Sequence, residues 1–290
     1  MIQNNKIVFR IQCVDQKGII AAVSSFFYQA GFNILSCEQF TDSNQGMYYM
    51  RIAIDGNDLK TSKSDLEAQF GAFAQNYSLD WRVNYMSEKQ NVAILVSKTS
   101  HCLYDILEKH SEGLLDCNIP LIIANHPDLE NIANQFKIPF YCLSVTPETK
   151  ATQEQQVIEL LEKHHVDLIV MARYMQILTD TFIQHFPNRI INIHHAFLPA
   201  FKGANPYRRA YDRGVKMIGA TAHYATADLD EGPIIDQDVE RVSHIFSPKK
   251  LSLLGAEIER KVLSSAVKSH LDCRIIVTGN KTIVFPEINE

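Results

Sequence analysis

Short, almost wholly aliphatic runs recur along the chain from residue 91 onward, with helical patterns between them. Three of these runs are Val92 to Ser97, Asp167 to Met171 and Arg189 to Ile193. Strands that are apolar on both faces are typical of a parallel sheet covered by helices on each side. We therefore expect residues 91–290 to form one α/β domain with a mostly parallel, Rossmann-like sheet.

Residues 1–86 carry a different pattern. Ile7 to Val14 has the alternation of a strand, and the helical repeat that follows it ends at Gly31. Two more strand-like runs, a second helix within Leu59 to Asn76 and a last strand complete the order βαββαβ, which is that of a small ferredoxin-like sandwich. The polar joint Ser87 to Gln90 contains no glycine or proline, so we expect a stiff connection between two domains.

Composition and charge predict a cytoplasmic protein. The 290 residues have a formal net charge of −5 and contain no run of lysine or arginine, so the sequence offers no basic patch for a nucleic-acid backbone. The first residues lack the pattern of a signal peptide, and no stretch approaches the roughly 18 apolar residues of a membrane span. We expect neither nucleic acid nor membrane as a partner.

The cysteines and histidines do not indicate a metal site. The six cysteines form no Cys-x-x-Cys pair and lie mostly in apolar runs, as reduced core residues do. The doublets His164-His165 and His194-His195 are poor chelating pairs, because neighbouring side chains point in different directions. We therefore expect no metal and no cofactor.

Polar side chains with catalytic potential stand at the end of one aliphatic run. Asn192 and His194 end the run that begins at Arg189, and a later turn supplies Asp228 and Asp230. Strand ends over a rigid sheet hold the chemistry of many α/β enzymes. An amide, an imidazole and a carboxylate can polarise a carbonyl and move a proton, which suits acyl transfer or hydrolysis. The alternative is that these are polar groups satisfied within the structure.

A longer set of motifs resembles the formyltransferase catalytic domain, which handles 10-formyltetrahydrofolate. The matching motifs are Asn192, His194, the loop Phe197 to Ala204, the strand Gly219 to Tyr224 and the turn Asp228 to Gly232. The resemblance implies that Asn192, His194 and Asp230 form the catalytic trio. His223, in the strand that enters the site, is either a partner of this trio or a histidine with a purely structural role.

The resemblance also predicts a folate pocket. Met171 to Leu178 follows a strand and matches the folate-binding segment of the family. The residues that it implies for folate binding are Met175, Gln176, Ile177, Leu178, Asp228 and Leu229. The apolar members of this set are equally typical of a hydrophobic core.

The first domain resembles an ACT domain, a small ligand-binding module. The matching residues are Asp15-x-x-Gly18-Ile19 and Gly31-Phe32-Asn33-Ile34. The resemblance implies a small amino-acid effector, glycine or methionine at the level of the family, at a site with Gly18 and Asn33. It also implies a homo-oligomer, because paired modules usually build such a site. Gly18 would let a ligand approach the backbone, or it serves the turn alone.

The loop after the first strand of the second domain bears on the acceptor of the formyl group. Transferases that act on a phosphorylated glycinamide nucleotide have a glycine-rich loop there, whose bare N–H groups reach the phosphate. Here Ser97 to Cys102 contains no glycine, which favours water as the acceptor. Lys98 in this loop either attracts an anion or is solvated.

Nearly the whole chain resembles the formyltetrahydrofolate deformylase family. The resemblance implies hydrolysis of 10-formyltetrahydrofolate to tetrahydrofolate and formate, with water as second substrate, which supplies formate and balances the one-carbon folate pool for purine biosynthesis. One alternative is a folate-dependent formyltransferase with an amine acceptor, since it would share the trio. The other is a folate or amino-acid sensor without catalysis.

Overall fold

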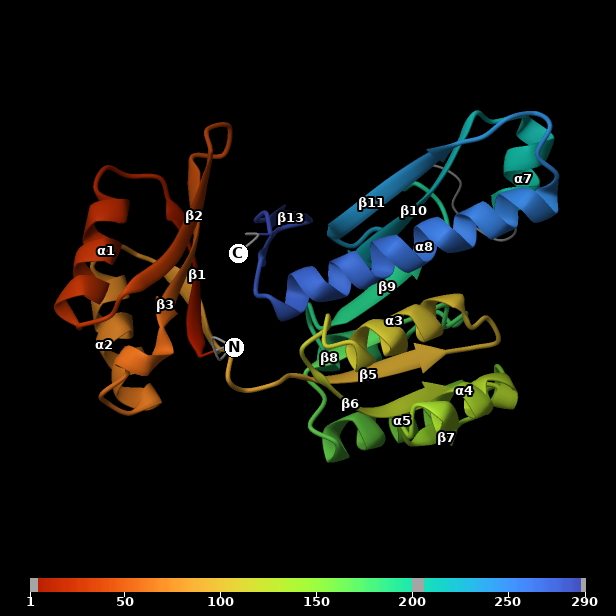
Figure 1. Ribbon diagram of the computed structural model, residues 1–290, viewed down its shortest axis with the longest axis horizontal. Helices are drawn as coiled ribbons and strands as arrows, with labels where there is room; N and C mark the ends of the chain where they lie inside the picture. The colour runs from red at the N-terminus through yellow and green to blue at the C-terminus, as the bar shows by residue number, and fades with distance from the viewer. Residues whose placement is uncertain (1–4, 200–205, 288–290) are drawn as a thin grey trace. The chain divides into compact units, whose positions relative to one another are not determined.

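The computed structural model describes residues 5–199 and 206–287. The chain divides into two compact units (Figure 1), one of Met1–Lys89 with Cys273–Ile276 and Ile283–Glu290, and one of Gln90–Asp272 with Val277–Thr282. The segments from 273 onward that cluster with the first unit fall within the range 91–290 expected for the second domain. Part of the predicted loop motif, residues 200–205, lies outside the described residues.

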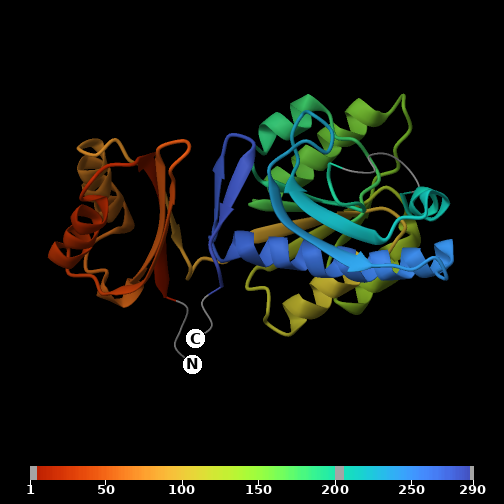
Figure 2. The same cartoon turned by 90° about the horizontal axis from the view of Figure 1, so that it is seen from above.

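The first unit has the predicted βαββαβ order. Its elements are β1 (Lys6–Val14), α1 (Ile19–Gln29), β2 (Ile34–Asp42), β3 (Met47–Asp55), the 3₁₀ turn η1 (Gly56–Asp58), α2 (Lys63–Gln75) and β4 (Asp80–Tyr85). The four strands form one sheet in the order β2-β3-β1-β4, and β1 pairs antiparallel with both β3 and β4. Both helices cover the same face of this sheet (Figure 2).

The core of the first unit lies between the sheet and its helices. Alternate residues of β1 point into it, among them Phe9, whose ring centroid lies 4.6 Å from that of Phe70 on α2. Gly18 begins α1 with a left-handed φ of 93°, a conformation that glycine adopts without a side-chain penalty. Ser62 and Asp65 form a capping box that starts α2.

The other face of this sheet is covered by C-terminal residues of the same unit. Arg10 Nη1 donates to the carbonyl of Ile275 at 2.8 Å, and Arg51 Nε donates to the carbonyl of Cys273 at 3.2 Å. Tyr49, fully buried, packs with Ile276 and Phe285. These segments belong to the two-stranded sheet of β12 (Ile275–Thr278) and β13 (Lys281–Val284).

The second unit is the predicted mostly parallel α/β domain. Its elements are β5 (Asn91–Val96), α3 (His101–Ser111), β6 (Asn118–Ala124), η2 (Pro127–Leu129), α4 (Glu130–Gln135), β7 (Phe140–Cys142), α5 (Lys150–Lys163), β8 (Leu168–Met171), α6 (Asp180–His185), β9 (Ile190–His194), α7 (Pro206–Arg213), β10 (Met217–Tyr224), β11 (Ile234–Arg241) and α8 (Pro248–Leu271). The sheet order is β11-β10-β9-β8-β5-β6-β7. Strands β5 to β9 are parallel, whereas β10 runs antiparallel to β9 and β11.

Helices cover both faces of this seven-stranded sheet. Figure 2 shows α3 and α8 on one face and α5 and α6 on the other. The aliphatic strands supply both cores: Ala93 and Leu95 of β5 pack with residues of α5 and α6, and their buried neighbour Ile94 lies outside that cluster. Burial on both faces explains the unbroken aliphatic runs of the sequence.

Register places the predicted polar residues together. Asn192 of β9 lies beside Met171, the last residue of β8, and pairs across the sheet with His223 of β10. His194 pairs with Thr221. The carboxyl ends of neighbouring parallel strands therefore meet where the sequence predicts a site.

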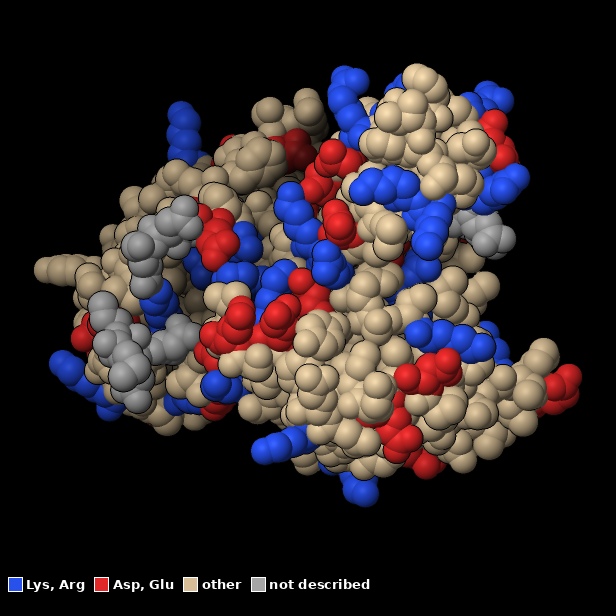
Figure 3. Space-filling view, turned by 45° about the vertical axis from the view of Figure 1, so that its right-hand side comes forward, with Lys and Arg blue, Asp and Glu red and all other residues tan. Residues whose placement is uncertain are grey.

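Charge and hydropathy of the structure add two observations. On the face shown in Figure 3, basic and acidic side chains are interspersed and neither sign forms a continuous patch. Among the described residues, no helix is both long enough and apolar enough to cross a lipid bilayer.

Candidate active site

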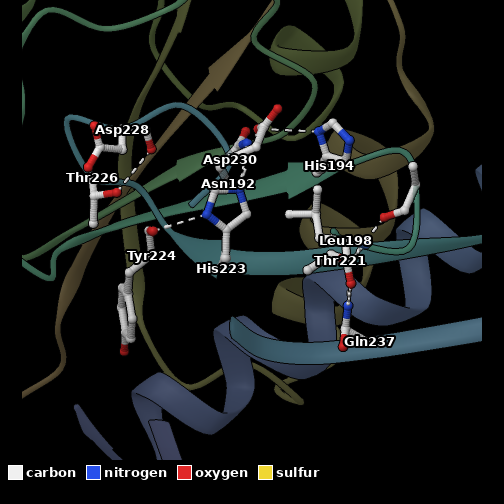
Figure 4. A network of polar contacts seen from close by, with 11 residues as sticks. Asn192, His194, Leu198, Thr221, His223, Tyr224, Thr226, Asp228, Asp230 and Gln237 are labelled. Carbon is white, nitrogen blue, oxygen red and sulfur yellow. Dashed lines mark hydrogen bonds and ion pairs between the residues drawn. The ribbon is translucent and has the colours of Figure 1, made fainter. Parts of the chain in front are cut away.

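The structure brings Asn192, His194 and Asp230 together. Asn192 and His194 are alternate residues of β9 and so project to the same side of the sheet. Asp230 comes from the turn between β10 and β11, and its Oδ1 lies 3.2 Å from His194 Nδ1. Figure 4 shows these two side chains pointing toward each other, with Asn192 beside them. Both side chains of the ion pair are largely buried, at 6% and 11% exposure.

The turn that carries Asp230 is tightly constrained. Asp230 has a φ of 58°, in the left-handed region, which aspartate tolerates better than most residues. A side chain at Gly232 would collide with the backbone carbonyl of Tyr224, and the N–H of Tyr224 donates to the carbonyl of Pro233 at 2.9 Å. Close backbone approach at Gly232 therefore fixes the direction of the Asp230 side chain.

The surroundings of Asp230 keep its carboxylate ionised. Burial alone would raise the pKa of Asp230, but the hydrogen bond and the attraction from His194, with smaller attractions from His223 and His195, lower it below the usual value of 3.8. An ionised Asp230 next to Nδ1 holds a proton on that nitrogen of His194, so Nε2 is the nitrogen left for substrate. Within the described residues, His194 Nε2 is buried and has no hydrogen-bond partner.

His223 orients the amide of Asn192. Its Nδ1 lies 3.0 Å from the carbonyl of Tyr224, which can only accept, so Nδ1 carries a proton. Burial lowers the pKa of His223, so the ring is neutral and its Nε2 is an acceptor. The atom of Asn192 that lies 3.2 Å from Nε2 must therefore be the donor Nδ2. His223 thus contacts a member of the trio, and its part in the reaction stays a prediction.

A cavity of about 520 Å³ opens beside the trio. Its lining includes the trio and five of the six predicted folate residues, namely Met175, Gln176, Ile177, Leu178 and Leu229. Asp228 belongs to the same turn but is not among the lining residues. Met175, Ile177 and Leu229 are 57%, 58% and 55% exposed, so these apolar side chains form a surface for a flat ring rather than a core.

The segment after β8 is held in place by α5. The hydroxyl of Tyr174 accepts from Gln153 Nε2 at 3.0 Å, and Lys150 donates to the carbonyl of Ile177. The backbone N–H of Met175 donates to Ser97 Oγ at 3.1 Å. These bonds fix a stretch that has no regular secondary structure, as a binding wall requires.

A second set of contacts fixes the loop that follows β9. Thr221 Oγ1 donates to the carbonyl of Ala196 at 2.9 Å and accepts from the N–H of Leu198 at 3.0 Å, while Gln237 Nε2 donates to the same hydroxyl at 2.9 Å (Figure 4). Thr221 and Gln237 were not predicted as site residues. The one sequence signal for Thr221 is its place in the matching strand.

Arg173 and His195 also line the cavity and were not predicted as site residues. Arg173 has a left-handed φ of 65°, a strained conformation for a residue with a long side chain. Burial, Arg173 and His194 together lower the pKa of His195 to about 4, so this ring is neutral at pH 7. His195 therefore adds no positive charge beside His194.

The residues predicted for an effector lie apart in the first unit. Gly18 borders an open depression of about 450 Å³ between α1 and α2, with Ser25 and Phe73 among its other residues. Asn33 is not among the residues that line it, and its backbone N–H donates to Asp58 Oδ2 at 2.8 Å. The structure thus does not bring the two predicted residues together in one depression.

One group of potential metal ligands occurs in the described part of the chain. Atoms of His101, Cys102 and Glu259 lie within 4.8 Å of one another. Arg173 Nε lies 3.5 Å from Glu259 Oε2, however, and burial raises the pKa of the Cys102 thiol well above its ordinary value. A guanidinium and a protonated thiol both oppose a bound cation.

Comparison with known proteins places the chain in a family. Residues 90–267 match the formyl transferase family model, and residues 7–71 match the ACT domain model. Fold and site thus define an enzyme of the formyl transferase class with an ACT domain before it. A formyltetrahydrofolate deformylase of Synechocystis sp. is 48% identical, covering 98% of this chain and all of the relative. The chain belongs to the formyltetrahydrofolate deformylase family.

Solved structures agree with this placement. A formyltetrahydrofolate deformylase from Pseudomonas syringae superposes with a TM-score of 0.95 at 39% identity, covering 98% of this chain and 96% of that one. Glycinamide ribonucleotide transformylase 1 from Symbiobacterium toebii has a TM-score of 0.64 at 27% identity and covers 68% of this chain and 95% of its own. The transferase thus shares the fold of only part of this chain.

Proposed function

We propose that the chain hydrolyses 10-formyltetrahydrofolate to tetrahydrofolate and formate. The observation that carries the proposal is the convergence of Asn192, His194 and Asp230 at the wall of a cavity lined by Met175 to Leu178. The relatives named deformylases, similar over nearly the full length of the chain, support hydrolysis over transfer.

Asn192 binds the formyl oxygen. One of its two Nδ2 hydrogens is directed to His223 Nε2, so the other is free to donate to the oxygen on which negative charge develops. Because the amide is held before the substrate arrives, no reorientation is needed as the tetrahedral intermediate forms. Loss of such a donor commonly costs about two to three orders of magnitude in rate.

Asp230 and His194 position water and move its proton. The Asp230 carboxylate accepts a hydrogen bond from the attacking water and stabilises a positive charge on His194. Water oxygen bonds to the formyl carbon as one water proton passes to His194 Nε2, the bond from that carbon to N10 breaks, and His194 Nε2 delivers that proton to N10. Formic acid then loses its remaining acidic proton and leaves as formate.

The decisive experiment is formate release from 10-formyltetrahydrofolate with no amine added. We expect turnover in the wild type and a fall of about two to three orders of magnitude for Asn192→Ala, His194→Ala and Asp230→Ala. Strict dependence on an amine would instead identify a transferase, and tight folate binding without turnover would identify a sensor. A chelator is expected to leave the rate unchanged, because the trio supplies the polarisation and proton transfer.

The family of the chain is also the basis for proposals about its effector, its assembly and its location. We propose a small amino acid as effector near Gly18, a homo-oligomer, and a cytoplasmic location with a role in the folate pool of purine biosynthesis. The depression at Gly18 and the ACT match support the effector. Thermal shifts with glycine and with methionine, and light scattering of the purified protein, test effector and assembly separately.

A further inference from the structure

A group of polar side chains is buried between α8 and its neighbours. At its centre is Glu259 of α8, which is 1% exposed. Its Oε2 lies 2.7 Å from His101 Nε2 and 3.5 Å from Arg173 Nε, and its Oε1 accepts from the hydroxyl of Tyr207 at 2.5 Å. We call His101, Arg173, Tyr207 and Glu259 the Glu259 cluster.

The cluster is internally matched in charge and hydrogen bonding. Burial alone would raise the pKa of Glu259, but the hydrogen bond from His101, the attraction of Arg173 and the hydrogen bond from Tyr207 lower it. Glu259 is therefore an ionised, buried carboxylate whose partners come from three other segments of the chain. A buried charge is tolerated only when it is paired in this way.

The ring of Tyr207 occupies the space beside Gly255, where any other residue would have a side chain. Gly255 precedes Glu259 by one turn of α8, and a Cβ at that position would overlap the phenol ring of Tyr207. Tyr207 thus packs onto bare helix backbone while its hydroxyl reaches Glu259. Arg173 likewise keeps a left-handed φ of 65°, a strained conformation, while contacting the same carboxylate.

The Glu259 cluster borders the cavity that holds the trio. Arg173 belongs to the segment after β8 and lines the same cavity as the trio and the predicted folate residues. His101 and Glu259 come from α3 and α8, which cover the face of the sheet opposite α5 and α6 (Figure 2). His195 adjoins both groups, because its ring centroid is 5.2 Å from that of His194 and 6.4 Å from that of Tyr207. The cluster therefore adjoins the trio through His195 and Arg173.

We propose that the Glu259 cluster closes the acceptor side of the formyl site and so determines that water, rather than an amine, takes the formyl group. The inference rests on the proposed function. A transferase of this fold must admit an amine beside the trio as well as the folate. In this chain the tyrosine ring, the guanidinium and the ion pair of the cluster would occupy that approach, and the proposal is that they leave room for water alone.

The alternative reaction that the cluster prevents is chemically complete without further reactants. An amine nitrogen would bond to the formyl carbon, the bond from carbon to N10 would break, and the proton lost by the amine would pass to N10. The same Asn192, His194 and Asp230 would serve this reaction. Access to the formyl carbon, rather than the trio itself, therefore separates hydrolysis from transfer.

The test is a partition experiment with a small primary amine, glycinamide. Wild type, Tyr207→Ala and Arg173→Gly are each given 10-formyltetrahydrofolate with glycinamide, and formate and N-formylglycinamide are measured separately. We expect almost only formate from the wild type and a fraction of N-formylglycinamide at least roughly tenfold higher from both opened variants. Tyr207→Phe, which keeps the ring and loses the hydroxyl, is the matched control and should stay near the wild-type ratio.

Two outcomes would overturn the inference. One is a wild type that formylates glycinamide as readily as the variants, and the other is an Arg173→Gly variant that is folded by thermal unfolding yet gives the wild-type ratio. Glycine accepts a left-handed φ, so Arg173→Gly keeps the test decisive if Tyr207→Ala does not fold. A wild type that releases no formate contradicts the proposed function itself, which separates the two failures.

Discussion

Asn192 Nδ2 lies 3.2 Å from His223 Nε2, and this contact fixes the direction in which the amide of Asn192 is turned. A neutral His223 that donates from Nδ1 to the carbonyl of Tyr224 leaves only an acceptor for Asn192. Without His223, the amide could turn its oxygen toward the developing negative charge. The orientation of one catalytic donor thus depends on the protonation state of a residue on the neighbouring strand.

The first prediction concerns this positioning role. His223→Phe keeps the ring but removes the acceptor, and we expect kcat to fall roughly 10- to 100-fold while KM changes less than about threefold. The reason is that Asn192 then spends part of its time with the wrong atom facing the formyl oxygen. Steady-state kinetics checks this, and a rise of KM with kcat unchanged would contradict it.

The second prediction concerns stability against pH. Burial lowers the pKa of His223, and burial with Arg173 and His194 lowers that of His195 to about 4, from an ordinary value of 6.5. Because the unfolded chain binds these protons more readily, their contribution to stability is fully present above about pH 6.5 and is lost as pH falls toward 4. Thermal unfolding between about pH 7 and pH 4 should show this decline, and His195→Gln should flatten it.

The third prediction concerns the turn that carries Asp230. Gly232→Ala forces the backbone away from Tyr224, since the new methyl group has no room. We expect formate release to fall at least roughly tenfold and the free energy of unfolding to fall by about 1–3 kcal/mol. Gly71→Ala, within helix α2, is the control. Its methyl group would lie at an ordinary contact distance of 3.6 Å from the side chain of Trp81, so urea denaturation should show no loss of stability.

The fourth prediction concerns the buried face of the first unit. Arg51→Met leaves Glu38 without the guanidinium that lies 2.9 Å away, with both side chains only 12% exposed, and removes the donor that lies 3.2 Å from the carbonyl of Cys273. We expect urea denaturation to show a loss of about 1–3 kcal/mol. Lys261→Met removes a pair whose lysine is 75% exposed, and its effect should stay within about 0.5 kcal/mol. Equal effects of the two substitutions would contradict the prediction.

Much of the fold could be predicted from local pattern. The alternation of Ile7 to Val14 predicted the strand β1, and the aliphatic run that ends in His194 predicted a strand buried on both faces. The trio was predicted because its motifs, at a strand end and in a turn, resemble those of the formyltransferase domain. The distances between these three residues depend on the strand register and on the conformation of the turn, and neither can be read from the motifs.

The Glu259 cluster was not predicted, for a physical reason. His101, Arg173, Tyr207 and Glu259 lie in four separate segments, and each has an ordinary surface interpretation when taken alone. Only the packing of α3 and α7 on α8 brings them to one point. The sequence signal that was present is Gly255, a glycine in the middle of a helical repeat, which marks close approach by another group.

The domain boundary shows a similar limit. The hairpin pattern near the C-terminus was visible, but periodicity does not say which sheet a hairpin covers. The backbone carbonyls of Cys273 and Ile275 accept from Arg51 and Arg10, two residues of the first unit. Long-range side chain to backbone contacts of this kind leave no local trace in sequence.

The packing of Tyr49 against C-terminal residues has a consequence for folding during protein synthesis. The ribosome completes residues 1–89 long before Ile276 and Phe285, which pack on Tyr49, exist. A nascent chain therefore lacks these two contacts of Tyr49 until translation has almost ended. The first unit cannot complete its packing before its C-terminal residues are made, so its folding is not simply vectorial from its first residue.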